Sequence, residues 1–203
     1  MKQSILSLVI FAFICNAPVL AQQVHPDQQP LVPKALSDGD KKKLASEVLD
    51  SLFGKLHNEK SEQKARLLAR AIWKIWGRSG SPTADLLLVQ AERAMAAGKQ
   101  QIAISILSTV IDQYPGFTEA WNKRATAYFI ADDFDNSLKD IQQVLNREPR
   151  HFGALSGMGL IYQQLGKNKK ALSAFRRALA IHPQLKDARR AVKNLVGKVE
   201  QDI

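Results

Sequence analysis

Cysteine is almost absent from this chain of 203 residues, because its one cysteine, Cys15, lies close to the N-terminus. The rest of the chain therefore has no disulfide, no thiolate metal site and no cysteine nucleophile. Aromatic residues make up only 7% of the chain, but hydrophobic residues make up 45%. That content is enough for one domain with its own core, held together by aliphatic packing.

Long apolar runs are also absent. The longest, ILSLVIFAFIC, follows Lys2, precedes Pro18 and has 11 residues. A helix that crosses a bilayer needs about 20 residues. With Val19 and Ala21 as the small residues at the −3 and −1 positions of a cleavage site, the run has the features of a cleaved export signal. We therefore expect residues 1–21 to be a signal peptide cut after Ala21. The Gln- and Pro-rich residues 22–36 predict a flexible linker.

Patterns that carry catalysis or bind metals are missing as well. The four histidines have no metal-ligand spacing, and no serine lies in a G-x-S-x-G context. Gly153, Gly157 and Gly159 lack the following Lys-Ser or Lys-Thr of a phosphate loop. The acidic stretch ADDFD at 131–135 lacks the glycine and the distal Glu of a calcium loop. The sequence predicts no catalytic residue, no cofactor and no metal site, and hence a protein that is not an enzyme.

What the chain does have is an internal repeat. Pro115, Pro149 and Pro183 each end a helical pattern, and they are equally spaced along the chain. This spacing defines three units, 84–117, 118–151 and 152–185, each with two apolar-periodic stretches separated by a polar turn. Two helices within a period of about 34 residues are typical of the tetratricopeptide repeat (TPR).

The residue types of the three units agree with that period. Small residues occupy the eighth and twentieth positions of each unit, where two helices cross closely: Ala91, Ala103, Ala125, Ser137, Gly159 and Ala171. Larger side chains surround the crossing, among them Leu87, Trp121, Tyr128, Leu155 and Tyr162. Over about half its length the chain thus resembles the TPR family. The resemblance implies an all-α fold, a TPR-type α-solenoid of helical hairpins with a C-terminal capping helix.

The flanking segments are predicted to be helical too. Residues 37–83 predict an N-terminal helical pair, a degenerate repeat in which Trp73 and Trp76 pack as core. Residues 186–203 predict the capping helix. Its apolar face comprises Leu185, Ala188, Val192, Leu195 and Val199.

The resemblance also implies a concave groove lined by the first helix of each unit. The side chains expected there are Leu88, Glu92, Met95, Asn122, Lys123, Thr126, Phe129, Ile130, Ser156, Leu160 and Gln163. TPR members that bind chaperones hold a terminal carboxylate with a clamp of Lys, Asn and Arg. Here Lys123 alone is basic among the corresponding positions. Binding of a terminal carboxylate is therefore not expected of this chain. The groove suits an apolar peptide or helix better. Alternatively, the linker or the N-terminal pair fills it in cis.

Positive charge is concentrated towards the C-terminus. The formal net charge is +10, and residues 152–203 hold ten Lys/Arg against three Asp/Glu. We expect a basic patch of Arg176, Arg177, Lys186, Arg189, Arg190 and Lys193. Such a patch suits anionic lipid, glycan or an acidic protein, or is a solvated surface without a ligand. Nucleic acid is not expected as a partner, because the chain carries an export signal.

An exported TPR domain of this kind resembles small periplasmic TPR proteins of Gram-negative bacteria that support cell-envelope integrity. The resemblance implies a non-catalytic periplasmic adaptor that binds a protein partner in its groove. Two alternatives stay open at this point. One is a basic module that binds anionic lipid or glycan of the envelope, and the other is an accessory subunit of a periplasmic enzyme.

Overall fold

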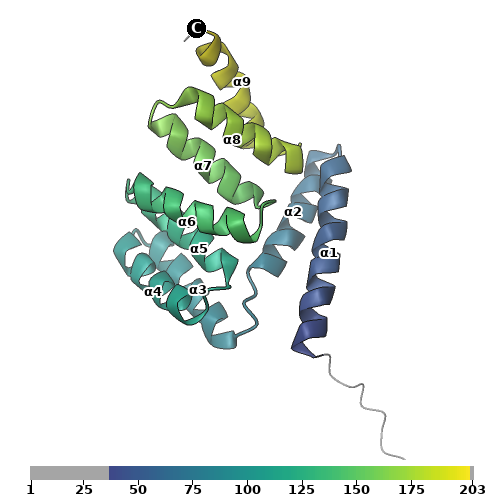
Figure 1. The fold of residues 1–203 in the computed structure, drawn as a ribbon, viewed down its shortest axis with the longest axis vertical. Helices are drawn as coiled ribbons and strands as arrows, with labels where there is room; N and C mark the ends of the chain where they lie inside the picture. Colours follow the sequence, from purple (N-terminus) through teal and green to yellow (C-terminus); the bar gives the residue numbers. More distant parts are fainter. Residues whose placement is uncertain (1–36, 202–203) are drawn as a thin grey trace, which may run out of the picture. The chain divides into compact units, whose positions relative to one another are not determined.

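The computed structural model describes residues 37–201, and these residues are helical throughout except for short turns. The helices are α1 (Asp38–Asn58), α2 (Glu62–Trp76), α3 (Pro82–Ala96), α4 (Gln100–Gln113), α5 (Thr118–Ile130), α6 (Phe134–Arg147), α7 (Phe152–Gln164), α8 (Asn168–Ile181) and α9 (Lys186–Gln201). Figure 1 shows α3 to α9 stacked as successive hairpins, and α1 and α2 lying beside the stack. The all-α solenoid expected from the repeat is confirmed.

Within each unit the two helices cross at the small residues. Ala91, Ala103 and Ala171 are fully buried, and Gly159 is buried as well. A Cβ atom at Gly159 would lie 2.8 Å from the ring of Phe175 on the facing helix. This glycine is therefore required by a close helix crossing, and it has no part in a phosphate loop.

The last helix, α9, begins one repeat period after α7, so it lies in the register of a first helix. Its apolar face packs on α8, with Ala188 and Leu195 buried. Arg189 and Lys193 occupy the positions that Leu155 and Gly159 hold in α7, and both are exposed. Long charged side chains at these two positions prevent another helix from packing closely, so α9 presents a solvated end to the stack.

The hairpin α1–α2 does not continue the stack at its other end, as a degenerate repeat before α3 would. Leu86 on α3 is 57% exposed, whereas its counterparts Ala120 and Ala154 are buried against the preceding unit. Arg93 is exposed as well, at the position where Ile161 is buried on α7. Because Arg93 cannot be buried there without a partner, this face of α3 suits water rather than a preceding hairpin.

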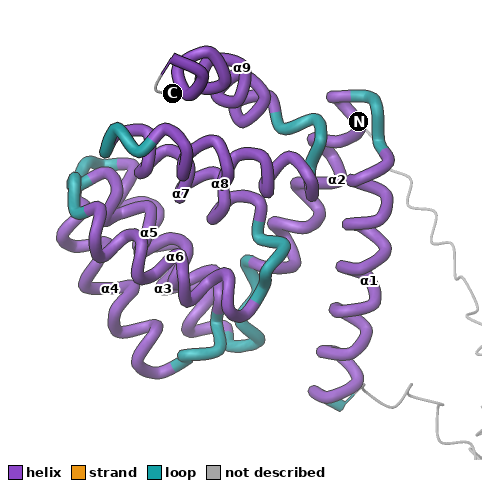
Figure 2. Tube along the Cα trace, turned by 45° about the horizontal axis from the view of Figure 1, so that its top comes forward, coloured by secondary structure: helices purple, strands orange, loops and turns teal. Residues whose placement is uncertain are grey.

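The hairpin packs instead beside the third unit, as Figures 1 and 2 show. Its core of Phe53, Leu56, Ile72 and Trp76 also includes Phe152, the first residue of α7. Polar contacts add to this docking. Arg150 pairs with Asp50 at 2.7 Å and lies 4.2 Å from the ring centroid of Phe53. His57 Nδ1 donates to the backbone oxygen of Ala180 at 2.9 Å.

The expected signal peptide (1–21) and linker (22–36) lie outside the described residues. Within residues 37–201, no helix has both the length and the apolar character that a bilayer-crossing segment needs.

Candidate peptide-binding groove

An open, mostly apolar groove lies between α5 and α7. It encloses a hollow of about 350 Å³. Six of the predicted groove residues line this hollow: Asn122, Thr126, Phe129, Ile130, Ser156 and Leu160. Ile130 is 47% exposed and Leu160 is 45% exposed, from opposite walls of the groove. Two large aliphatic side chains are therefore open to solvent at one place.

Helical periodicity places these residues together. Asn122, Thr126 and Phe129 are spaced by four and three residues along α5, so they share one face of the helix. Ser156 and Leu160 share a face of α7 in the same way. Gly157 lies between them and packs over Ile141 of α6, since a Cβ at this glycine would lie 3.7 Å from Ile141 Cδ1, and both residues line the hollow.

Other residues that the sequence assigns to the groove lie elsewhere. Leu88 is 5% exposed in the core of the first unit, because α3 buries the stripe formed by Ala84, Leu88 and Ala91. Met95 is half-buried against that same core. Gln163 is exposed on α7 outside the hollow. The expectation that Leu88 faces a ligand is thus wrong.

Glu92 and Lys123 pair with each other near the start of the groove. Lys123 Nζ lies 2.7 Å from Glu92 Oε1 and 3.5 Å from Glu119 Oε1. Burial alone would lower the pKa of Lys123, but Glu119 and Glu92 outweigh it and raise this pKa above its usual value. Lys123 therefore stays charged, and two carboxylates already neutralise it.

The pairing includes a buried histidine for which the sequence had no signal. Glu119 is 2% exposed; its Oε2 lies 3.3 Å from His151 Nε2, and Asn122 Nδ2 donates to Oε1 at 3.1 Å. His151 Nδ1 accepts from the backbone N–H of Ala154 at 3.0 Å, which makes His151 the N-cap of α7. The proton must then lie on Nε2, facing Glu119. His151 thus caps α7 with a ring that is fully buried.

Two tryptophans from α2 cover this polar cluster. Trp76 stacks on His151 with centroids 4.1 Å apart, and Trp73 meets the same ring edge-on at 5.2 Å. A Cβ at Gly153 would lie 2.6 Å from Trp73 Cη2, so Trp73 is pressed against the backbone of α7. The Lys123 ammonium lies 5.9 Å from the Trp73 ring centroid.

The N-terminal hairpin thus fills one end of the groove in cis. Gly153 belongs both to the lining of the hollow and to the contact with Trp73. The end at the beginning of α5 and α7 is closed, and the end at Phe129, Ile130 and Leu160 is open. The alternative in which the N-terminal pair fills the groove in cis therefore applies to the closed end. Binding of an apolar peptide or helix at the open end stays a prediction.

The predicted basic patch lies on α8 and α9, away from the groove lining. All six of its side chains are exposed: Arg176, Arg177, Lys186, Arg189, Arg190 and Lys193. Within residues 37–201 none of them forms an ion pair, and Arg189 donates to the Gln184 side chain at 3.1 Å. Arg176 and Arg177 border a second hollow, of about 520 Å³.

In the described part of the chain, no three His, Cys, Asp or Glu side chains come close enough together to hold a metal ion. The acidic stretch at 131–135 has a structural role, because the Asp133 side chain accepts from the backbone N–H of Asn136 at 3.2 Å and caps α6.

Comparison with known proteins agrees with this architecture. A family model described as tetratricopeptide repeat matches residues 153–185. A TPR repeat-containing protein of Rhizobium etli is 39% identical over 151 residues, which cover 74% of this chain and 74% of that protein.

Solved structures show the same fold. The crystal structure of MamA has a TM-score of 0.55 at 20% identity, covering 82% of this chain and 88% of that chain. The first TPR of Spaghetti (RPAP3), bound to an HSP90 peptide, has a TM-score of 0.56 at 21% identity, covering 58% and 93%. The repeat register, the stacked hairpins and the relative from Rhizobium etli together show that this chain belongs to the TPR proteins.

Proposed function

We propose that this protein is a non-catalytic periplasmic adaptor that binds an apolar segment of a partner protein in the open half of the α5–α7 groove and thereby supports the cell envelope. The TPR fold is that of a protein-interaction module. The observation that carries the proposal is the exposure of Ile130 and Leu160 across one apolar hollow. Side chains of this size are rarely left open together unless a partner covers them.

The ligand that fits is an apolar side chain or helix face. The related structure of RPAP3 holds an HSP90 peptide, SRMEEVD, which supports peptide binding by this fold. An acidic peptide end would need free cations in the groove. Here Lys123 is neutralised by Glu92 and Glu119, and Trp73 covers Gly153. The open half has no Lys or Arg in its lining, so it favours apolar contacts.

The partner can be identified by cross-linking in cells. A photo-reactive amino acid at Thr126, exposed on the wall of the groove, is expected to capture one defined protein. Adding Leu160→Glu should abolish the capture, because a buried, unpaired carboxylate opposes apolar binding. Leu67→Glu is the matched control, since Leu67 is also an exposed leucine but lies on α2. Equal capture by both variants would contradict the groove.

The periplasmic location rests on the N-terminal pattern of Lys2, the apolar run and Val19–Ala21. Its test is osmotic-shock fractionation, followed by mass measurement of the mature chain. We expect the protein in the periplasmic fraction, with Gln22 at its N-terminus. A cytoplasmic, uncut chain would refute the location and the envelope role, but it would leave binding in the groove intact.

A further inference from the structure

The outer surface of α8 and α9 carries cations that have no acidic partners. Nine Lys/Arg and two Asp/Glu lie between residues 168 and 201. Some cations elsewhere in the described chain are paired with carboxylates. Arg124 binds Asp140 through two nitrogens at 2.8 and 2.9 Å, and Arg150 binds Glu148 and Asp50. The cations of the α8–α9 surface have no such pairs among residues 37–201, so they are available to a ligand.

A hollow of about 520 Å³ lies within this surface. Lys169, Arg176 and Arg177 border it, and its apolar lining comes from Leu172, Ala180 and Val199. The combination is particular to the third unit. One repeat period earlier, α6 carries Asp135, Gln142 and Gln143 where α8 carries the three cations. The charge is therefore not a requirement of the repeat.

A cationic rim around an apolar floor fits a ligand that offers carboxylates next to an aliphatic side chain. Arginine pairs with carboxylates in a two-pronged geometry, so Arg176 and Arg177 suit Asp or Glu side chains. Nucleic acid would use the charges but leave the apolar floor empty. A membrane is disfavoured too, because no large apolar side chain is prominently exposed on the described part of α8 or α9.

We propose that the α8–α9 surface binds an acidic segment of a partner protein, with an aliphatic side chain in the hollow and carboxylates on Lys169, Arg176 and Arg177. The segment does not dock as one more repeat helix, since Arg189 and Lys193 prevent a close helix crossing on α9. This site is separate from the α5–α7 groove, and it stands or falls independently of the function proposed for that groove.

Fluorescence anisotropy tests the proposal. The full chain is titrated into two labelled peptides of about twelve residues. One peptide consists of Glu with Leu at every third or fourth position, and in the other Ser replaces each Leu. The Leu peptide should bind more tightly, and Arg176→Glu with Arg177→Glu should weaken it roughly tenfold at low salt. The matched control is Lys42→Glu with Lys43→Glu, which makes the same change in net charge.

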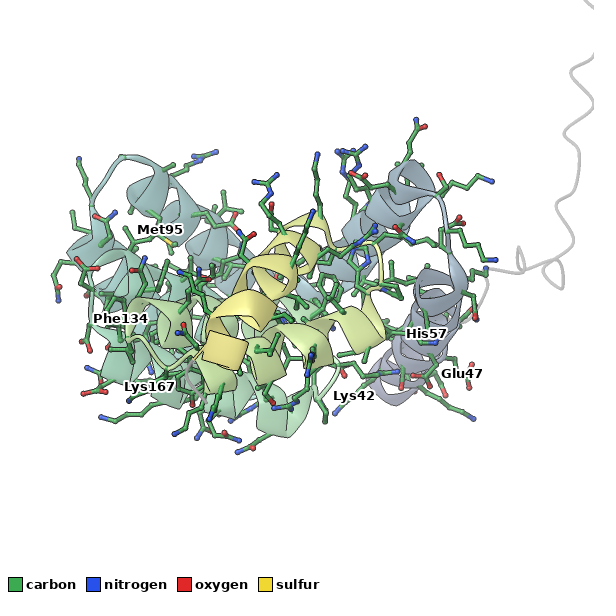
Figure 3. The ribbon with its side chains drawn as sticks, turned by 90° about the horizontal axis from the view of Figure 1, so that it is seen from above. Lys42, Glu47, His57, Met95, Phe134 and Lys167 are labelled. Carbon is green, nitrogen blue, oxygen red and sulfur yellow. The ribbon has the colours of Figure 1, made fainter. Side chains whose placement is uncertain are left out.

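The control pair lies on the exposed face of α1, and Figure 3 shows Lys42 well apart from Lys167, which precedes α8. The control should weaken binding by less than about twofold, because distant charges are screened. Equal weakening by both pairs would mean that net charge alone attracts the peptide, and it would overturn the proposal.

A second variant separates the hollow from the charges. Ser173→Trp fills the hollow from an exposed position without changing the charge. It should bring the affinity for the Leu peptide down to that for the Ser peptide. If wild type binds both peptides equally, the hollow has no role and the proposal fails. Phosphatidylglycerol vesicles or a DNA duplex can be added as competitors of the labelled Leu peptide. If either one displaces it at a lower concentration of negative charge than unlabelled Leu peptide does, the proposal is overturned in favour of that ligand.

Discussion

The contact between Trp73 and Gly153 leads to a sharp prediction about the docked hairpin. Gly153→Ala would place a Cβ 2.6 Å from Trp73 Cη2 and 2.7 Å from Cζ2, well inside the carbon–carbon contact distance of about 3.5–4.0 Å. The indole cannot easily move away. It is wedged edge-on by Trp76, His151 and Phe152, at centroid distances of 5.2, 5.2 and 5.6 Å.

Two opposing terms set the magnitude. Overpacking of this kind costs about 1–3 kcal/mol. Replacing glycine by alanine within a helix stabilises it by about 0.5–1 kcal/mol. We therefore expect Gly153→Ala to lower the free energy of unfolding by up to about 2.5 kcal/mol. Gly157→Ala, one turn along α7, should raise that free energy instead, because its Cβ meets Ile141 at an ordinary 3.7 Å.

The assay is urea unfolding of both variants, followed by circular dichroism and by tryptophan fluorescence. Both substitutions gain the same helix propensity, so this contribution cancels when their changes in the free energy of unfolding are subtracted. In a protein that already carries Trp73→Leu, Gly153→Ala should lower the free energy of unfolding much less than it does in the wild type. If the Gly153→Ala variant is as stable as the Gly157→Ala variant, the hairpin is not pressed against α7. The conclusion that one half of the groove is closed would then be wrong.

Three further predictions concern the rest of the fold. Burial lowers the pKa of His182, so the unfolded chain binds a proton at this residue more readily than the folded chain does. The free energy of unfolding should therefore decrease as the pH drops below about 6.5, by at most about 1.4 kcal/mol per pH unit. His182→Gln should reduce that slope in urea titrations. Ala171→Leu should overpack the crossing of α7 and α8 and cost about 1–3 kcal/mol, and an unchanged melting temperature would contradict the repeat register. Arg189→Leu with Lys193→Ala should leave an apolar surface at the end of the stack and cause self-association, which light scattering would detect as a mass that rises with concentration. A strictly monomeric variant would show that these two charges do not prevent self-association.

The sequence alone determined the repeating part of this protein. A constant period, with small residues at 91, 125 and 159, is enough to place the helix pairs and their crossings. The same register assigns Phe129, Ile130 and Leu160 to one wall or the other of a groove. These features are predictable because the contacts within and between successive units are local, and because a helix face is set by periodicity.

Only the tertiary structure decided where the N-terminal hairpin docks. Periodicity shows that Trp73 and Trp76 lie on an apolar face, but it does not say which of several apolar surfaces receives them. That choice depends on contacts between residues far apart in the chain: Trp73 with Gly153, Trp76 with His151, and His57 with the backbone of Ala180. The Glu119–His151 pair was hidden for the same reason, since neither residue has a local pattern that names its partner. Which half of the groove is closed follows from these long-range contacts, and the repeat cannot reveal it.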